Sequence, residues 1–303
     1  MSDMRQAGGF ELDRRALARS FDRAAAGYDA AATLQQQVRE ELLSRLDYFT
    51  LEPAWILDLG AATGAGARAL RRRYPRARVL AIDIAPGMVR AVPRRPWPWA
   101  APRIETLCAD AYALPLADHS ISLAFSNLML QWCDRPEAVL GELARVLVPG
   151  GLLLFSSFGP ATLGELRAAW SAADSGVHVS DFPAMQRLAE AAMQAGLEPP
   201  VLDTDTHLLH YADAHTLMRS LRQLGARNAA RARARGLTSP RRLQSMIRAY
   251  EGARTPRGLP ASYEVLYGAA FAPPADAHTA PRAPSAERGE HVVALSALKA
   301  RRP

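Results

Sequence analysis

The chain has 303 residues, of which 49% are hydrophobic, and a formal net charge of +7. This length allows one α/β domain with additions or at most two domains, and no apolar run approaches the ~20 residues of a membrane span. The amino terminus lacks an apolar signal segment, and two cysteines make neither a disulfide framework nor a metal site. We therefore expect a cytoplasmic protein with no membrane segment and no bound metal.

Residues 1–13 are expected to be loosely ordered, and the single folded domain is expected over 14–272. Helical composition without proline predicts two helices over 17–47 that pack above the site described next.

The stretch 55–66 is the most informative, because a short apolar run that carries Asp58 breaks there into a loop of small residues. Gly60, Ala62 and Gly64 lie in this loop, and a helix-forming run follows. A buried strand, a tight turn and a helix N-terminus together let the backbone approach a ligand closely. The methyl group of Ala62 fits where a glycine would be usual if the φ of Ala62 is negative, and we expect the small residue to allow the close approach.

A second apolar run ends in Asp83, with Ile84 beside it. Asp83 lies about 20 residues beyond the glycines, the distance at which a βαβ unit delivers a carboxylate to ribose hydroxyls. A dinucleotide fingerprint is disfavoured because Ala62 and Ala65 occupy two of its glycine positions. The sequence therefore predicts a nucleoside-containing cofactor on a parallel α/β sheet.

The next segments continue the alternation of strands and helices, and the cofactor core is expected over about 50–158. Asp110 and Ala111 follow the third predicted strand, and Asn127 follows the fourth, Ile121–Ser126. A helix and a turn then lead to the fifth strand, Leu152–Ser157.

The substrate and cap region is expected over 159–261 and mixes further helices with two strands. The predicted helices are 163–173, 183–195, 218–237 and 240–250, and the strands are 204–211 and 262–271. Residues 273–303 are rich in Pro and Ala and are expected to form a flexible tail.

Nine arginines crowd the segment from Arg219 to Arg248. Such a run is usually a solvated helix face, and the alternative is a docking surface for an acidic partner. Nucleic acid is disfavoured as a partner, because Lys299 is the only lysine and the excess of arginine indicates compositional bias.

The loop around Asp58, Gly60 and Gly64 resembles the Asp-x-Gly-x-Gly-x-Gly loop of the class I S-adenosylmethionine-dependent methyltransferases, with Ala62 in place of the middle glycine. The resemblance implies a Rossmann-like sheet with an N-terminal helical cap and a C-terminal helical insertion. It also implies S-adenosylmethionine as the cofactor.

The same resemblance implies the roles of the residues that follow the third strand. Asp110 would accept a hydrogen bond from the adenine amino group, and the backbone at Ala111 would serve the ring.

Other segments are similar to the malonyl-acyl-carrier-protein O-methyltransferases of biotin synthesis. They are Phe21–Tyr28, Ser126–Cys133, Phe155–Phe158, Met218–Leu221 and Leu259–Gly268. This resemblance implies methylation of the free carboxylate of malonyl-acyl-carrier protein, or of malonyl-coenzyme A. It also implies that the carrier docks on the Arg219–Arg248 segment.

A carboxylate acceptor is already ionised near neutral pH, so no general base is required. Alignment and desolvation would supply the catalysis, with Tyr28, Gln131 and Trp132 orienting the substrate. Plain packing is the alternative role of these residues. Four other functions remain open: a related hydroxylase or assembly factor, methylation of another small molecule, methylation of nucleic acid, and cofactor binding without catalysis.

Overall fold

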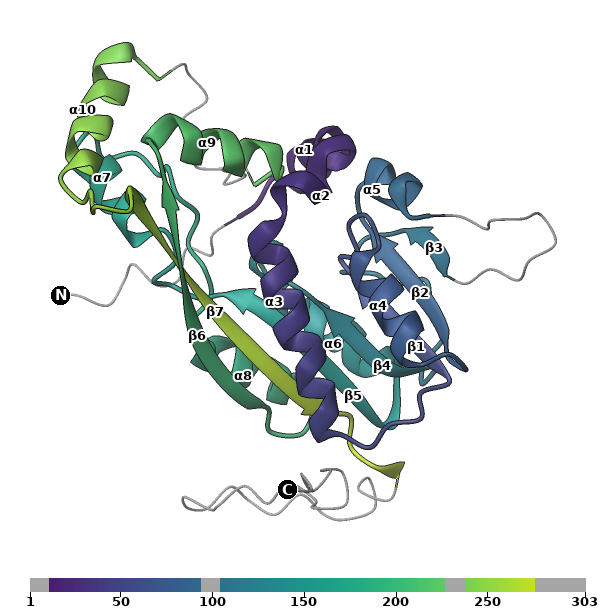
Figure 1. Cartoon of the computed structure of the whole chain (residues 1–303). Coiled ribbons are helices and arrows are strands. Elements are labelled where there is room, and N and C mark those ends of the chain that lie inside the picture. Colours follow the sequence, from purple (N-terminus) through teal and green to yellow (C-terminus); the bar gives the residue numbers. More distant parts are fainter. Residues whose placement is uncertain (1–10, 94–103, 227–237, 276–303) are drawn as a thin grey trace, which may run out of the picture.

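The computed structural model describes residues 11–93, 104–226 and 238–275, and its centre is a seven-stranded sheet (Figure 1). The strands lie in the order β3–β2–β1–β4–β5–β7–β6. Their bounds are β1 Trp55–Leu59, β2 Arg78–Asp83, β3 Glu105–Cys108, β4 Ile121–Ser126, β5 Leu147–Phe158, β6 Val201–Tyr211 and β7 Leu259–Phe271. Strands β1 to β5 pair in parallel, whereas β7 runs antiparallel to both β5 and β6.

Helices cover both faces of the sheet, because successive apolar side chains of each central strand point to opposite sides. Ile56 and Phe125 pack into the core under α3 and α4, whereas Leu57 and Leu59 pack into the core under α6 and α8. The helices are α1 Arg14–Ala24, α2 Tyr28–Ala31, α3 Thr33–Ser44, α4 Ala65–Arg73, α5 Pro86–Ala91, α6 Pro136–Val146, α7 Gly164–Ser171, α8 Met185–Gln194, α9 Ala214–Gln223 and α10 Pro240–Glu251.

The short helices α1 and α2 form a cap beyond the carboxyl ends of the first strands (Figure 1). Asp13 begins α1 by accepting a hydrogen bond from the Ala16 amide at 3.0 Å, as an N-cap residue does. Ala24 of α1 packs with Ala85 and Met88, which lie at the end of β2 and in α5. The cap is thereby held over the edge where parallel α/β sheets bind ligands.

The C-terminal addition consists of α9 and α10, which lie in sequence between β6 and β7. Helix α10 packs against α7, as Figure 1 shows at one end of the molecule. Ser239 caps α10 by accepting a hydrogen bond from the Arg242 amide.

The structure confirms the predicted Rossmann-like α/β fold and corrects several boundaries. Residues 17–47 hold three α-helices instead of two, because non-helical backbone at Gly27 and Ala32 interrupts the run. Strand β7 begins at Leu259 rather than at 262, and α9 spans Ala214–Gln223. The rest of that predicted helix, 227–237, lies outside the described residues, as do 1–10 and 276–303 of the predicted flexible ends.

No helix in the described part of the chain combines the length and the apolar character needed to cross a membrane.

Candidate active site

The loop after β1 depends on two glycines with positive φ. Gly60 has a φ of 74°, and a Cβ atom there would lie 2.4 Å from Cγ of Met129. Gly64 has a φ of 79° and turns the chain into α4, with its backbone close to Val92. Gly60 therefore permits a close approach of two loops, whereas Gly64 directs the chain into the helix and does not line the pockets described below.

Ala62, between these glycines, has a φ of 46°, so the negative φ at which its methyl group would fit without strain is not the one adopted. This left-handed turn directs the Ala62 amide to Oδ2 of Asp83, with an N···O distance of 2.9 Å. The methyl group packs beside the cluster that contains Ala85 and Met88. A left-handed conformation costs an alanine about 1–2 kcal/mol, so the loop is strained at this residue.

Asp83 ends β2, and backbone amides fix the position of its half-buried carboxylate. The Ala62 amide donates to Oδ2, and the Ala85 amide donates to Oδ1 at 2.8 Å. Burial raises the pKa of Asp83 above its ordinary value, although these amide bonds act in the opposite direction. A carboxylate offers about four lone-pair positions, so Asp83 can still accept bonds from a pair of ligand hydroxyls.

Asp110 follows β3 and joins the edge of the sheet to α1. Its Oδ2 lies 3.0 Å from Nη1 of Arg14, and its Oδ1 accepts a bond from the Tyr112 amide at 3.1 Å. The Arg14 guanidinium also stacks over the Tyr112 ring, 4.7 Å from its centroid. Arg14 was not among the site residues predicted from the sequence, because a lone arginine in an Arg-rich helix gives no local signal of this contact.

Asn127 follows β4 and joins three elements at the centre of the site. Its Nδ2 donates to the Gln35 carbonyl of α3 at 3.1 Å, and its Oδ1 accepts a bond from the Ser156 hydroxyl of β5 at 3.0 Å. Ser156 is fully buried. This network holds the ends of β4 and β5 against α3.

The three residues predicted to orient a substrate come together around one cavity. Burial and the nearby Asp83 raise the pKa of Tyr28, so its hydroxyl stays protonated and can donate a hydrogen bond. Gln131 is only 5% exposed, and its Nε2 donates to the Leu128 carbonyl at 2.6 Å. Trp132 packs edge-on against Phe21 with a centroid distance of 5.4 Å.

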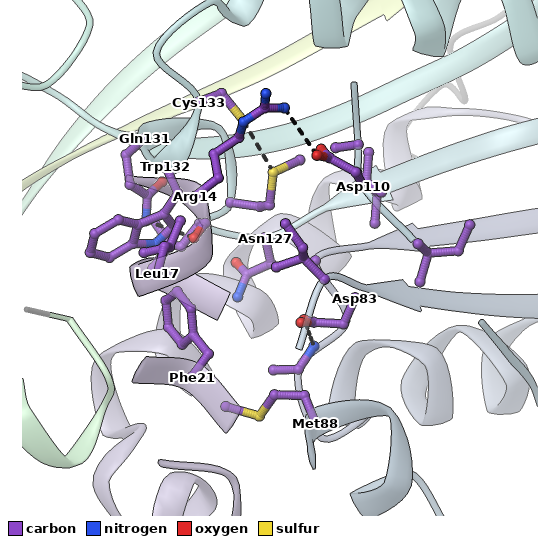
Figure 2. Close-up of a pocket in the computed structure, with 18 of the residues that line it drawn as sticks. Arg14, Leu17, Phe21, Asp83, Met88, Asp110, Asn127, Gln131, Trp132 and Cys133 are labelled. Carbon is purple, nitrogen blue, oxygen red and sulfur yellow. Dashed lines mark hydrogen bonds and ion pairs between the residues drawn. The ribbon is translucent and has the colours of Figure 1, made fainter. Parts of the chain in front are cut away.

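This first pocket has a volume of about 930 Å³, including the part open to solvent. In Figure 2, Asp83 and Asp110 lie across the pocket from Phe21 and Trp132, and Asn127 lies between them. The walls are mostly apolar, with a few polar groups that can fix the orientation of a ligand.

A second, more polar pocket of about 740 Å³ lies on the other side of the glycine loop. The two pockets share Tyr28, Gln35, Gly60, Ala62 and Asn127. They therefore form one divided cleft. All the predicted cofactor residues except Gly64 line one or both halves.

Asp58 lies at the base of the second pocket and is 2% exposed. Among the described residues, its Oδ2 has no hydrogen-bond partner. Burial raises the pKa of Asp58 to about 7, opposed mainly by the hydrogen bond from the Ala67 amide and less by the nearby Arg39 and Arg68 guanidinium groups. An unsatisfied buried carboxylate oxygen is costly, so this geometry favours a ligand that brings a hydrogen-bond donor.

Arg39 and Gln35 project from α3 into the second pocket, one helical turn apart. The sequence predicted helices over the site, but these two side chains were not among the predicted site residues. Their four-residue spacing, which places both side chains on one face of a helix, was the sequence signal that could have identified them. Arg39 and Asp58 give this half of the cleft a positive and a negative charge. An amino-acid group requires both, one for its carboxylate and one for its ammonium. The first half, with Asp83 and Asp110, suits a nucleoside.

Within the residues that the structure describes, no cluster of three His, Cys, Asp or Glu side chains could hold a metal ion.

Comparisons with known proteins show which family this chain resembles. A family model described as a methyltransferase domain matches residues 57–155, which include the glycine loop, Asp83 and Asn127. Two malonyl-acyl-carrier-protein O-methyltransferases are similar over most of the chain. The Halorhodospira halophila enzyme is 45% identical over 86% of this chain and 88% of its own length, and the Methylovorus enzyme is 44% identical over 89% and 92%.

Among solved structures, the YcgJ protein from Bacillus subtilis has a TM-score of 0.54 at 15% identity and covers 78% of this chain and 99% of its own. A Haloferax volcanii methyltransferase, solved in complex with its Trm112 activator, has a TM-score of 0.51 at 20% identity and covers 85% and 97%. At these identities the structural matches establish the fold alone.

Proposed function

The chain belongs to the malonyl-acyl-carrier-protein O-methyltransferases, and from this premise we propose that it methylates the free carboxylate of malonyl-acyl-carrier protein, using S-adenosylmethionine. The product is a methyl ester, formed early in biotin synthesis. A related bifunctional protein of Cellvibrio japonicus, which is 42% identical over 84% of this chain, is also named for biotin synthesis. The observation that carries the proposal is the divided cleft, with a nucleoside half and an amino-acid half that meet at Tyr28.

The residues of the cleft fit S-adenosylmethionine by their chemistry. Asp83 would accept hydrogen bonds from the ribose hydroxyls, and Asp110 with Ala111 would bind the adenine. The unpartnered Oδ2 of Asp58 would accept a bond from the ammonium group, and Arg39 would face the carboxylate. When bound, the cofactor supplies an electrophilic methyl group on a sulfonium centre.

The chain's own part in the reaction is to align and desolvate the acceptor. The malonyl carboxylate is ionised at neutral pH, and no histidine is among the described residues that line the first pocket. The Tyr28 hydroxyl is a hydrogen-bond donor that can orient a carboxylate, and the Gln131 amide, which donates one N–H to the Leu128 carbonyl, would supply its second N–H. The rings of Trp132 and Phe21 exclude water beside them.

The Arg219–Arg248 segment is proposed as the docking surface for the acidic carrier. In its described part, Arg219 and Arg222 of α9 and Arg241, Arg242 and Arg248 of α10 carry this charge. Attraction of opposite charges over such a surface raises the rate of association. Malonyl-coenzyme A is the alternative acceptor, and it would make less use of this surface.

A genetic experiment tests the proposal in the cell. The gene should restore biotin-independent growth to a bacterial strain that lacks its own malonyl-carrier methyltransferase. An Asp83→Ala variant should fail, because loss of two charge-assisted hydrogen bonds lowers cofactor affinity by about 2–3 kcal/mol. An Asp205→Ala variant, altered at an exposed position of β6, is the matched control and should restore growth.

Failure of the folded wild-type protein to restore growth would contradict the proposal. It would favour the alternatives, which are a cofactor-binding hydroxylase or assembly factor and a methyltransferase for another small molecule.

A further inference from the structure

A third pocket of about 500 Å³, including the part open to solvent, opens beside the first, and the proposed function assigns it neither the cofactor nor the reacting carboxylate. The two pockets share Trp132, Phe158 and Ala226, so they adjoin each other. The rings of Trp132 and Phe158 form the wall between them. The third pocket extends from this wall between β7, the segment 178–182 and α9.

The lining of the third pocket is largely apolar. Phe158 lies 5.7 Å from Phe182 and 5.6 Å from Tyr263, measured between ring centroids. Leu221 contributes an aliphatic wall from α9. Such walls favour a ligand segment with methylene and methyl groups.

A few polar groups interrupt this apolar lining, and His178 is held rigidly among them. Its Nε2 lies 2.7 Å from Oδ1 of Asp174, and its ring stacks on Trp170 at 3.7 Å with an interplanar angle of 9°. Ser180 also lines the pocket. Groups fixed in this way can select a ligand that carries amides among its apolar segments.

The pocket adjoins the described part of the basic segment. Leu221 faces the pocket, whereas Arg219 and Arg222 of the same helix are exposed. On the other side, Nη1 of Arg242 lies 3.9 Å from Asp174, the partner of His178. A ligand arm in this pocket would therefore bring an acidic protein attached to it against the arginines of α9 and α10.

We propose that the third pocket binds the pantetheine arm of the malonyl thioester, while the malonyl carboxylate reaches Tyr28 and Gln131 in the first pocket. The inference rests on the proposed function. A pantetheine arm combines methylene groups, a pair of geminal methyl groups and two amides, which matches the lining. The enzyme would thus recognise its acceptor by the arm as well as by the carboxylate.

Two acceptors of different arm length test this inference. Malonyl-pantetheine carries the full arm, and malonyl-N-acetylcysteamine carries only its first part. For the wild-type protein we expect kcat/KM to be at least about tenfold higher with malonyl-pantetheine, because a few buried methylene groups and one amide supply that difference. Equal values for the two thioesters would overturn the inference.

Variants on α9 and in the wall of the third pocket test whether the preference for malonyl-pantetheine arises there. Leu221→Trp should fill the third pocket and remove most of this preference, with little change in kcat/KM for the short thioester. Met218→Trp is the matched control, because Met218 is also half-buried on α9 but does not line the pocket, and it should keep the preference. Phe182→Ala removes part of the wall and should raise KM for malonyl-pantetheine alone.

Retention of the full preference by both Leu221→Trp and Phe182→Ala would overturn the inference. Calorimetric binding of S-adenosylmethionine provides a readout of the intact cofactor site in each variant. If the wild-type protein binds the cofactor but methylates neither malonyl thioester, the proposed function itself fails.

Discussion

At the scale of single residues, Ala62 is where the cofactor loop is strained. Its left-handed conformation costs about 1–2 kcal/mol, whereas a glycine there would add about 0.4–1 kcal/mol of unfolded-state entropy. Ala62→Gly should therefore raise the free energy of unfolding by up to about 1 kcal/mol, measured by urea denaturation. Ala61→Gly is the control, since Ala61 is buried without a positive φ, and this change should lower the same quantity by about 0.5–1 kcal/mol. Shifts of the same sign in both variants would contradict this account.

Asp58 should make the stability of the ligand-free protein depend on pH. Burial raises the pKa of Asp58 to about 7 from an ordinary 3.8, so the folded state binds more protons than the unfolded state between these values. Stability attributable to this group therefore falls as pH rises from about 4 to 7. Relative to wild type, Asp58→Asn should gain roughly 2–4 kcal/mol between pH 4 and pH 8.

Urea denaturation at these two pH values measures this gain, with Asp205→Asn on the exposed edge strand as the control. A difference between Asp58→Asn and wild type that does not change with pH would show that the carboxyl group is not perturbed.

The sequence predicted the site residues that follow strands, because parallel strands bring their carboxyl ends to one edge of the sheet. Asp83, Asp110 and Asn127 all line the cleft for this reason. Arg14 and Arg39 could not be predicted in the same way. Their positions depend on how α1 and α3 pack over that edge, which is a long-range property.

At the scale of elements, Asn127 is the side chain that joins β4, β5 and α3. Asn127→Ala should lower the free energy of unfolding by about 1–3 kcal/mol, because the buried Ser156 hydroxyl and the Gln35 carbonyl each lose a partner. It should also weaken S-adenosylmethionine binding, since Asn127 lines both halves of the cleft. Denaturation and calorimetry measure the two effects.

Ser122→Ala, on β4, the strand that ends just before Asn127, is the matched control because its bond to the Ala54 amide is exposed. We expect it to change both quantities little. Equal losses in the two variants would mean that Asn127 has no special role in joining these elements.

Periodicity and composition predicted the type of most elements, and tertiary packing decided where they end. The run 17–47 contains no proline that would mark the end of a helix. The chain nevertheless turns at Gly27 and Ala32, so that α1 can reach α5 and α3 can lie on the sheet. Strand β7 extends back to Leu259 because β6 offers partners along its whole length. Neither cause can be read from a local stretch of sequence.

At the scale of the whole molecule, the positive charge is expected to act on association with the acidic carrier. Reversing Arg219 and Arg222 to Glu should lower kcat/KM for malonyl-acyl-carrier protein by about tenfold, and added salt should reduce the difference from wild type. The value for malonyl-pantetheine, which lacks the carrier, should change much less.

Reversal of Arg72 and Arg76, which are exposed near the amino-terminal edge of the sheet, is the control of equal charge. Equal losses from the two double variants would show that net charge matters and that α9 is no docking surface.

The central claim is that the acceptor is the free carboxylate of a malonyl group on the carrier. Mass spectrometry of the carrier after incubation with the protein and S-adenosylmethionine tests it most directly, with acetyl-acyl-carrier protein, which has no free carboxylate, as the paired acceptor. We predict the gain of one methyl group on the malonyl form and no gain on the acetyl form. An unchanged malonyl carrier, or equal methylation of the two carriers, would contradict the claim.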